Sequence, residues 1–289
     1  MTFNVQQLGP SFVAEITGFT PELLSDAKVM AALHRHYLEN KTVVLRDAAL
    51  SPEQFVKFSE TFGSCDPHHV VAVRHPEQPK ITILSNQDET GRKPEMKTFG
   101  VGWHSDYSYK RVPSRATLLM AVVVPDQGGD TLFADTVAAY EALSEAAKHK
   151  ITGLRVRHEY RFMKDRSRPS ARWNFLSEAE QAATPEVIHP LVIRHPETGA
   201  LALFIAPGDL SGVKGIVDMD EAESDVLLSS LFDHMTQAHF TYRHKWRPRD
   251  LVIWDNRSTI HSATTDQLPA HQVRRMYRIT TNGSVPIAA

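Results

Sequence analysis

The sequence predicts a mainly β protein of the α+β class, an antiparallel barrel or jelly roll with helices packed on it. Helical patterns come early, within the first 62 residues, and many short segments rich in apolar and β-branched residues follow them. Strands and helices do not alternate regularly, as they would in a doubly wound sheet. No linker rich in proline, glycine or serine divides the chain, so we expect one domain over residues 1–289.

Each N-terminal element has a local cause in the sequence. Val13–Phe19 has a strand pattern that ends at a glycine and a proline, and Thr42–Arg46 (TVVLR) is dense in β-branched residues. Between them, Pro21–Asn40 has apolar residues at helical spacing and predicts one helix. Ser51–Phe62 opens with Ser-Pro-Glu-Gln, a helix cap followed by proline at the first helical position. Three phenylalanines then recur at helical spacing.

From residue 80 onward strand patterns dominate. The expected strands are Ile81–Leu84, Thr117–Val124, Val187–Arg194, Ala202–Ile205, Phe240–Lys245, Leu251–Trp254 and Met276–Thr280. Two helical patterns interrupt them, Val137–His149 and Glu221–Gln237. The polar segment 157–185 is either a solvated surface segment or a lid over an anionic substrate, and its charge pattern fits both.

Composition excludes several classes of protein. The formal charge is −2, which argues against nucleic acid as a partner. Cys65 is the only cysteine, so no internal disulfide or thiolate-only metal site can form. No apolar run is long enough to cross a bilayer, and the N-terminal segment lacks the basic and apolar parts of a signal peptide. We therefore expect a reduced, cytoplasmic protein without a membrane partner.

Histidine and aspartate residues in two segments form a candidate metal site. His104 and Asp106 lie two apart in Gly-Trp-His-Ser-Asp, a spacing that places both on one face only in extended structure. His261 follows the apolar strand Leu251–Trp254 and is a candidate third ligand if the fold returns it to the same point. Two histidines and one carboxylate form the facial triad of non-haem iron(II) enzymes, although the same set also holds zinc. The alternative is a buried histidine that hydrogen-bonds a nearby carboxylate.

Two arginines indicate an anionic ligand. Arg274 and Arg278 lie on one face of a strand with Met276 between them, because side chains alternate along a strand. If that face is the barrel interior, both guanidinium groups need anionic partners, since a buried unpaired charge is costly. If it is the outer face, they form salt bridges with protein carboxylates. The turn Gly128–Gly129 leads into a strand at Thr131, whose hydroxyl is a candidate donor to a ligand carboxylate.

These segments resemble the taurine dioxygenase and 2,4-dichlorophenoxyacetate dioxygenase family of iron(II)- and 2-oxoglutarate-dependent oxygenases over nearly the whole chain. The matching motifs are WHSDY at Trp103–Tyr107, GGDTLF at Gly128–Phe133, WDNRSTIH at Trp254–His261 and RRMYRIT at Arg274–Thr280. Their order and intervals also agree with the family. The resemblance implies a double-stranded β-helix, a form of jelly roll, with flanking helices outside it.

The resemblance also implies a role for each matching residue. The implied Fe(II) ligands, which are also the catalytic residues, are His104, Asp106 and His261. Arg274 would pair with the distal carboxylate of the cosubstrate 2-oxoglutarate, and Thr131 would hydrogen-bond the same carboxylate. Arg278 would face the anionic group of the primary substrate. His68 and His69 keep the general character of a pocket-lining loop and are candidate substrate-binding residues.

The implied reaction consumes O2 and 2-oxoglutarate, releases succinate and CO2, and hydroxylates a small anionic substrate, with or without subsequent cleavage. Candidate substrates are carboxylates, sulfonates, alkyl sulfates and aryloxy acids. The segment Gln87–Gly100 departs from better-known members, because it offers no asparagine close to His104 of the kind used for taurine. The family also implies a homo-oligomer, a dimer or tetramer. Two alternatives stay open, a zinc-dependent hydrolase on the same triad and a non-catalytic jelly-roll binding protein.

Overall fold

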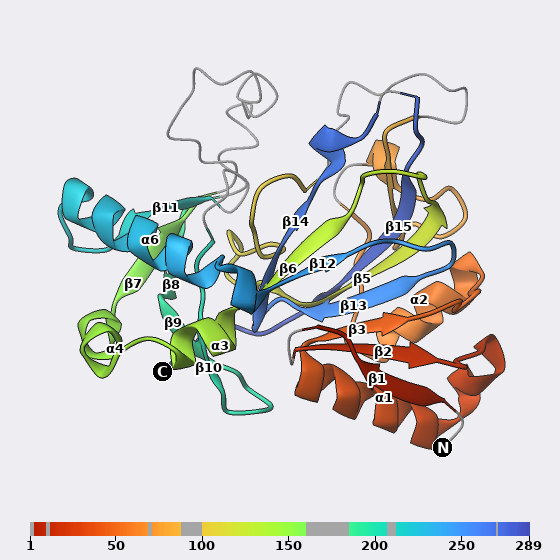
Figure 1. Cartoon of the computed structure of the whole chain (residues 1–289), viewed down its shortest axis with the longest axis horizontal. Coiled ribbons are helices and arrows are strands. Elements are labelled where there is room, and N and C mark those ends of the chain that lie inside the picture. Colours follow the sequence, from red (N-terminus) through yellow and green to blue (C-terminus); the bar gives the residue numbers. More distant parts are fainter. Residues whose placement is uncertain are drawn as a thin grey trace.

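The computed structural model describes residues 3–9, 12–68, 71–87, 100–159, 185–206, 212–269 and 271–289. Within these residues the structure is mainly β, as the sequence predicts. A seven-stranded sheet lies opposite a three-stranded sheet, and two further three-stranded sheets lie to one side (Figure 1). No helix among the described residues is long and apolar enough to cross a membrane. Most of the segment 157–185 falls outside them, so its role as a lid stays a prediction.

The large sheet contains, in spatial order, β1 (Asn4–Gln7), β2 (Val13–Thr17), β3 (Thr42–Leu45), β13 (Leu251–Asp255), β5 (Ser114–Val123), β15 (Arg275–Asn282) and β4 (Thr82–Ser85). The small sheet contains β12 (Thr241–His244), β6 (Thr131–Asp135) and β14 (Thr259–Ala263). The side sheets contain β11 (Val213–Ile216), β7 (Arg155–His158) and β8 (Val187–Pro190), and β10 (Leu201–Leu203), β9 (Val192–Arg194) and β16 (Ile287–Ala288). The helices are α1 (Ala27–Asn40), α2 (Pro52–Glu60), α3 (Thr136–Glu141), α4 (Glu145–Ile151) and α6 (Glu221–Met235), with the short 3-10 helix η1 (Pro21–Ser25) before α1.

The two faces of the large sheet bury different apolar clusters. β13 illustrates this, because successive side chains of a strand point to opposite faces. Ile253 belongs to the same cluster as Phe58, on the face covered by α1 and α2 (Figure 1). Val252 and Trp254 point the other way and pack with Phe133 of β6. The second cluster fills the space between the large and small sheets, which is the inner space of the fold.

The first helices show one correct prediction and one error. Ser51 and Gln54 form the predicted cap of α2, because each side chain accepts a hydrogen bond from the backbone N–H of the other residue. The prediction of one helix over Pro21–Asn40 is wrong. The Asp26 side chain accepts hydrogen bonds from two N–H groups of the following turn, so η1 ends and α1 begins there.

Two other predicted elements are also divided. The helix predicted over Val137–His149 is broken at Ser144, whose hydroxyl caps α4. The strand predicted over Val187–Arg194 is divided between two sheets. β8 pairs with β7 as far as Pro190 and the N–H of Leu191 still donates to the carbonyl of Leu154, after which β9 pairs with β10 and β16. The other predicted strands and the helix α6 are present with slightly shifted ends.

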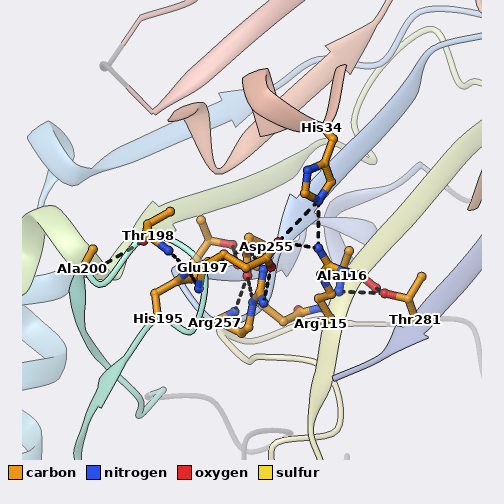
Figure 2. A network of polar contacts seen from close by, with 12 residues as sticks. His34, Arg115, Ala116, His195, Glu197, Thr198, Ala200, Asp255, Arg257 and Thr281 are labelled. Carbon is orange, nitrogen blue, oxygen red and sulfur yellow. Dashed lines mark hydrogen bonds and ion pairs between the residues drawn. The ribbon is translucent and has the colours of Figure 1, made fainter. Parts of the chain in front are cut away.

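An ion-pair network, buried at Asp255 and His195 and open to solvent at Glu197, joins α1, β5, the turn between β9 and β10, and the turn after β13 (Figure 2). Asp255 accepts hydrogen bonds from Nε and Nη2 of Arg257 at 2.8 and 2.7 Å, and from Nε2 of His195 at 3.0 Å. Glu197 bridges Nη1 of Arg257 and Nη2 of Arg115, both at 2.8 Å. Burial raises the pKa of Asp255, but Arg257 and His195 outweigh burial and hold that pKa well below its ordinary value. The ionised carboxylate therefore fixes the turn that leads into β14.

Arg257→Met should lower the free energy of unfolding by about 3–5 kcal/mol, because it leaves Asp255 ionised and buried without its main partner. Urea denaturation at pH 7 measures this loss. The paired carboxylate stabilises the fold above its unfolded-state pKa, and the contribution disappears as the pH falls through the lower folded-state pKa. The control is Arg155→Met, since Arg155 pairs with the exposed Asp218 and such pairs contribute at most about 1 kcal/mol. Equal losses in the two variants would contradict the role of the network.

Candidate metal centre

Two histidines from distant parts of the chain lie side by side through backbone pairing. His261 belongs to β14, and His104 forms an isolated antiparallel bridge with it. The N–H of each residue donates to the carbonyl of the other, both at 2.9 Å. Residues paired in this way carry their side chains on the same face, and the two imidazole centroids are 4.2 Å apart. The fold thus brings together the two histidines that the sequence analysis singled out.

Asp106 completes a three-residue cluster. Its carboxylate oxygens lie 4.0 Å from Nε2 of His104 and 3.7 Å from Nε2 of His261. One ligand atom from each residue lies within 4.8 Å of the other two, and all three residues are buried. The extended structure that this spacing requires is limited to a single bridge at His104, and a turn begins at Asp106. In that turn Tyr107 has a left-handed φ of 58°, which is costly for a residue with a side chain.

The donor atoms of the cluster fit a divalent metal ion. The two nitrogen-to-oxygen distances are too long for hydrogen bonds, so the alternative of a histidine bonded to a carboxylate does not describe the site. Nδ1 of His104 donates to the carbonyl of Gly102 at 2.8 Å, because a carbonyl can only accept. Nε2 of His104 therefore presents its lone pair to Asp106. Two imidazole nitrogens and one carboxylate oxygen suit Fe(II) and also Zn(II).

The protonation states of the cluster suit metal binding. Burial lowers the pKa of both His104 and His261, and the cationic Arg278 lowers it further. Both imidazoles are neutral at pH 7, the form in which histidine binds metals. Burial alone raises the pKa of Asp106, but electrostatic attraction to His261, Arg278 and His104 and the hydrogen bond from Thr117 outweigh burial and lower that pKa to about 2. The site therefore holds its ligands in the charge state that a metal requires.

β15 directs arginine into the inner space. Met276 packs in the inner cluster, and Nη1 of Arg278 lies 3.6 Å from Oδ1 of Asp106. Arg274 is 4% exposed, and its Nε donates to the carbonyl of Gly129 at 2.9 Å. Burial lowers the pKa of Arg274 to about 10, so it stays cationic at pH 7. No carboxylate in the described ranges lies within salt-bridge distance of Arg274, and such a buried guanidinium suits an anionic ligand.

Trp246 links Thr131 to Arg274, and the sequence analysis missed it. Its indole N–H donates to Oγ1 of Thr131 at 3.0 Å, and the guanidinium carbon of Arg274 lies 5.8 Å from its ring centroid. Gly129 allows this packing, because it adopts a φ of +70° and an added Cβ would lie 2.9 Å from Cδ of Arg274. No motif marks Trp246. The one signal in the sequence that could have found Trp246 is its position just after the strand predicted over Phe240–Lys245.

The remaining predicted pocket residues are not part of this cluster. His68 is half-buried, and its carbonyl accepts a hydrogen bond from Nε of Arg74 at 2.6 Å. His69 lies outside the described residues, as do residues 88–99 of the segment before the metal cluster. The role of His68 and His69 in substrate binding stays a prediction.

The fold and the cluster define a class, a mainly β protein with a buried site of two histidines and one carboxylate. The chain belongs to the taurine catabolism dioxygenase TauD, TfdA family, whose model matches residues 4–280. The resemblance inferred from the sequence motifs is therefore confirmed.

Similar proteins include enzymes named for their substrates. The chain is 32% identical over 298 residues to an alpha-ketoglutarate-dependent 2,4-dichlorophenoxyacetate dioxygenase of Burkholderia sp. (strain RASC), covering 98% of this chain and 95% of that protein. It is 33% identical over 292 residues to a putative alpha-ketoglutarate-dependent sulfonate dioxygenase of Schizosaccharomyces pombe, covering 98% and 70%. A crystal structure of AAD-2 with Mn(II) and N-oxalylglycine superposes with a TM-score of 0.85 at 28% identity, covering 100% of both chains.

His104→Gln and His261→Gln should each weaken Mn(II) binding by at least the roughly 10- to 100-fold that loss of a supporting residue costs. Equilibrium dialysis followed by metal analysis measures the affinity. His75→Gln is the matched control, because His75 is also buried but lies outside the cluster. An unchanged Mn(II) affinity in His104→Gln or in His261→Gln would show that the metal binds elsewhere.

Proposed function

We propose that this chain is an Fe(II)- and 2-oxoglutarate-dependent dioxygenase that oxidises a small anionic substrate. The observation that carries the proposal is the buried cluster of His104, Asp106 and His261, with its donor atoms facing one another. Family membership supports the same reaction class, since the similar enzymes are named as alpha-ketoglutarate-dependent dioxygenases. Alpha-ketoglutarate is 2-oxoglutarate, so the cosubstrate follows from these names.

The three cluster residues would hold the iron. Bound Fe(II), together with 2-oxoglutarate and O2, supplies the oxidising chemistry that hydroxylates the substrate and leaves succinate and CO2. Three protein ligands leave coordination positions for the cosubstrate and O2. Trp254 and Phe133 pack beside His261, with ring centroids 4.6 and 6.4 Å from it. These apolar rings exclude water from the cluster and hold the imidazole in place.

Arg274 and Thr131 would hold the far carboxylate of 2-oxoglutarate. Arg274 has donors left over after its bond to Gly129, and its charge has no carboxylate partner within the described chain. Thr131 accepts from the indole of Trp246, so its own hydroxyl hydrogen is free to donate to an anion. Two donors on one carboxylate would orient the cosubstrate toward the metal.

Arg278 would orient the primary substrate by its acid group. Its guanidinium lies 3.6 Å from Oδ1 of Asp106 and is 19% exposed, so it combines a position beside the cluster with access from solvent. Sulfonates and aryloxy acids, the substrate classes of the similar enzymes, carry the anion that such a residue binds. Alkyl sulfates and carboxylates share that charge. His68 and His69 complete the proposed substrate pocket.

The alternatives explain less of the site. A zinc hydrolase uses a general base beside a metal-bound water and has no need of two inward arginines. A binding protein without catalysis needs no complete set of metal ligands, yet the set is complete here. The family assignment favours the dioxygenase over both.

The proposal extends to the organisation of the protein. Residues 1–289 form one dioxygenase domain, and the large and small sheets form the two walls of a double-stranded β-helix with flanking helices. The protein acts in the cytoplasm as a dimer or tetramer, without nucleic acid or membrane partners.

A succinate-formation screen with Fe(II), 2-oxoglutarate and a panel of carboxylates, sulfonates, alkyl sulfates and aryloxy acids tests the reaction class. Substrate-dependent succinate is expected from at least one anionic class, because Arg278 favours an acid group. Turnover that ignores Fe(II) and 2-oxoglutarate, or that Zn(II) supports equally well, would contradict the proposal.

Arg274→Met should raise the KM for 2-oxoglutarate by about 10- to 100-fold, the cost of losing hydrogen bonds to a charged group. Arg278→Met should raise the KM for the primary substrate by a similar factor and leave that for 2-oxoglutarate nearly unchanged. Steady-state kinetics with either compound varied measures both constants. Arg275→Met is the control, because Arg275 lies on the same strand with its side chain on the opposite face. Equal effects of the two variants on both constants would remove the distinction between the arginines.

A further inference from the structure

Oδ2 of Asp106 is already occupied by a hydrogen bond from within the protein. Oγ1 of Thr117 donates to it at 2.6 Å. Thr117 lies on β5, is fully buried, and belongs to none of the motifs that marked the metal cluster. Oδ2 also lies 3.7 Å from Nε2 of His261. The other oxygen, Oδ1, lies 4.0 Å from Nε2 of His104 and 3.6 Å from Nη1 of Arg278, and no hydrogen bond within the described residues holds it. The two oxygens of this carboxylate therefore have different environments.

The direction of the Thr117 hydrogen bond is set by Asn256. Oδ1 of Asn256 accepts the backbone N–H of Asp106 and the indole N–H of Trp254, both at 3.2 Å. Neither donor can reverse its role, so the amide nitrogen of Asn256 must point the other way, where it donates to Oγ1 of Thr117 at 2.9 Å. The hydroxyl of Thr117 accepts that bond and directs its single hydrogen at Asp106.

We propose that Thr117 and Asn256 are positioning residues for the metal, which hold Oδ2 of Asp106 and so present Oδ1 as the single carboxylate ligand. This inference rests on the proposed metal site. The two hydrogen bonds from Asn256 to Thr117 and from Thr117 to Asp106 form a relay. Without this relay the carboxylate of Asp106 can rotate about its Cβ–Cγ bond, which has a broad torsional preference. It can then bind a metal through either oxygen or through both.

The relay is anchored at its base. The N–H of Asn256 donates to the carbonyl of Arg115 at 2.9 Å, and its carbonyl accepts the hydroxyl of Ser105 at 2.8 Å. Asn256 also sits between Asp255 and Arg257, the central pair of the ion-pair network (Figure 2). Asn256 is therefore held by the hydrogen bonds and ion pairs of its turn, and it hydrogen-bonds Ser105 and Asp106 from that fixed position. Supporting residues of this kind tune metal affinity by orienting the ligands.

A purely structural role predicts a different result from a positioning role. If the relay only satisfies buried polar groups, its loss lowers stability but leaves the geometry at a bound metal unchanged. Metal affinity and the ligand-field spectrum of bound Co(II) report that geometry directly. Neither readout depends on turnover or on knowing the primary substrate.

Thr117→Val tests the inference, because valine keeps the shape of threonine and removes the hydroxyl. Titration of the metal-free protein with Co(II) should give a Kd raised by about 10- to 100-fold and an altered visible spectrum. Thr117→Ser keeps the hydroxyl. It should restore the Kd to within about threefold of that of the unsubstituted protein and restore the visible spectrum. Urea denaturation of the metal-free variants separates the change in stability from the change in affinity, and Thr117→Ala replaces Thr117→Val if that variant does not fold.

The outcomes separate the two proposals. An unchanged Kd and spectrum in Thr117→Val, with Co(II) binding that depends on His261, would overturn the positioning role and leave the metal site intact. Failure of Thr117→Ser to recover the affinity would also overturn it. Absence of Co(II) binding by the unsubstituted protein, or binding that survives His261→Gln, would overturn the proposed metal site and this inference with it.

Discussion

The reciprocal backbone hydrogen bonds between His104 and His261 are the constraint on which the site depends. They bring a loop from the middle of the chain against β14, a strand near its C-terminal end. Asp106 follows two residues later, so its carboxylate reaches both imidazoles. β14 also pairs with β6, whose first residue is Thr131. These two pairings therefore place the proposed metal ligands and Thr131, the proposed cosubstrate residue, in the same inner space.

The buried aspartates Asp255 and Asp106 differ in how completely other groups of the protein pair their charge. Asp255 receives three hydrogen bonds from Arg257 and one from His195, so its charge is fully paired within the protein. Asp106 accepts one short hydrogen bond from Thr117 and lies 3.6 Å from Nη1 of Arg278, and it faces two neutral imidazoles at distances too long for hydrogen bonds. A buried charge with incomplete partners is costly unless a ligand completes them. Asp255 is therefore a structural carboxylate, whereas Asp106 is available for the proposed metal ion.

Sequence periodicity predicted the features that depend on local geometry. The alternation along β15 placed Met276 and Arg278 on one face, and the structure turns that face inward. Periodicity did not predict that the helical segments divide at Asp26 and Ser144. The apolar spacing continues across both positions, but each side chain caps a new helix there. The sequence pattern did not predict the contacts of Trp246, for a different reason. Its bond to Thr131 joins residues far apart in the chain, and no spacing rule reports such a contact.

One metal ion is proposed to bind between His104, Asp106 and His261. The most direct measurement is an anomalous difference map from crystals of the full chain soaked in Mn(II), collected near the manganese absorption edge. We expect one strong peak within bonding distance of Nε2 of both histidines and of Oδ1 of Asp106. A peak at another site, or no peak between these three residues at saturating Mn(II), would contradict it.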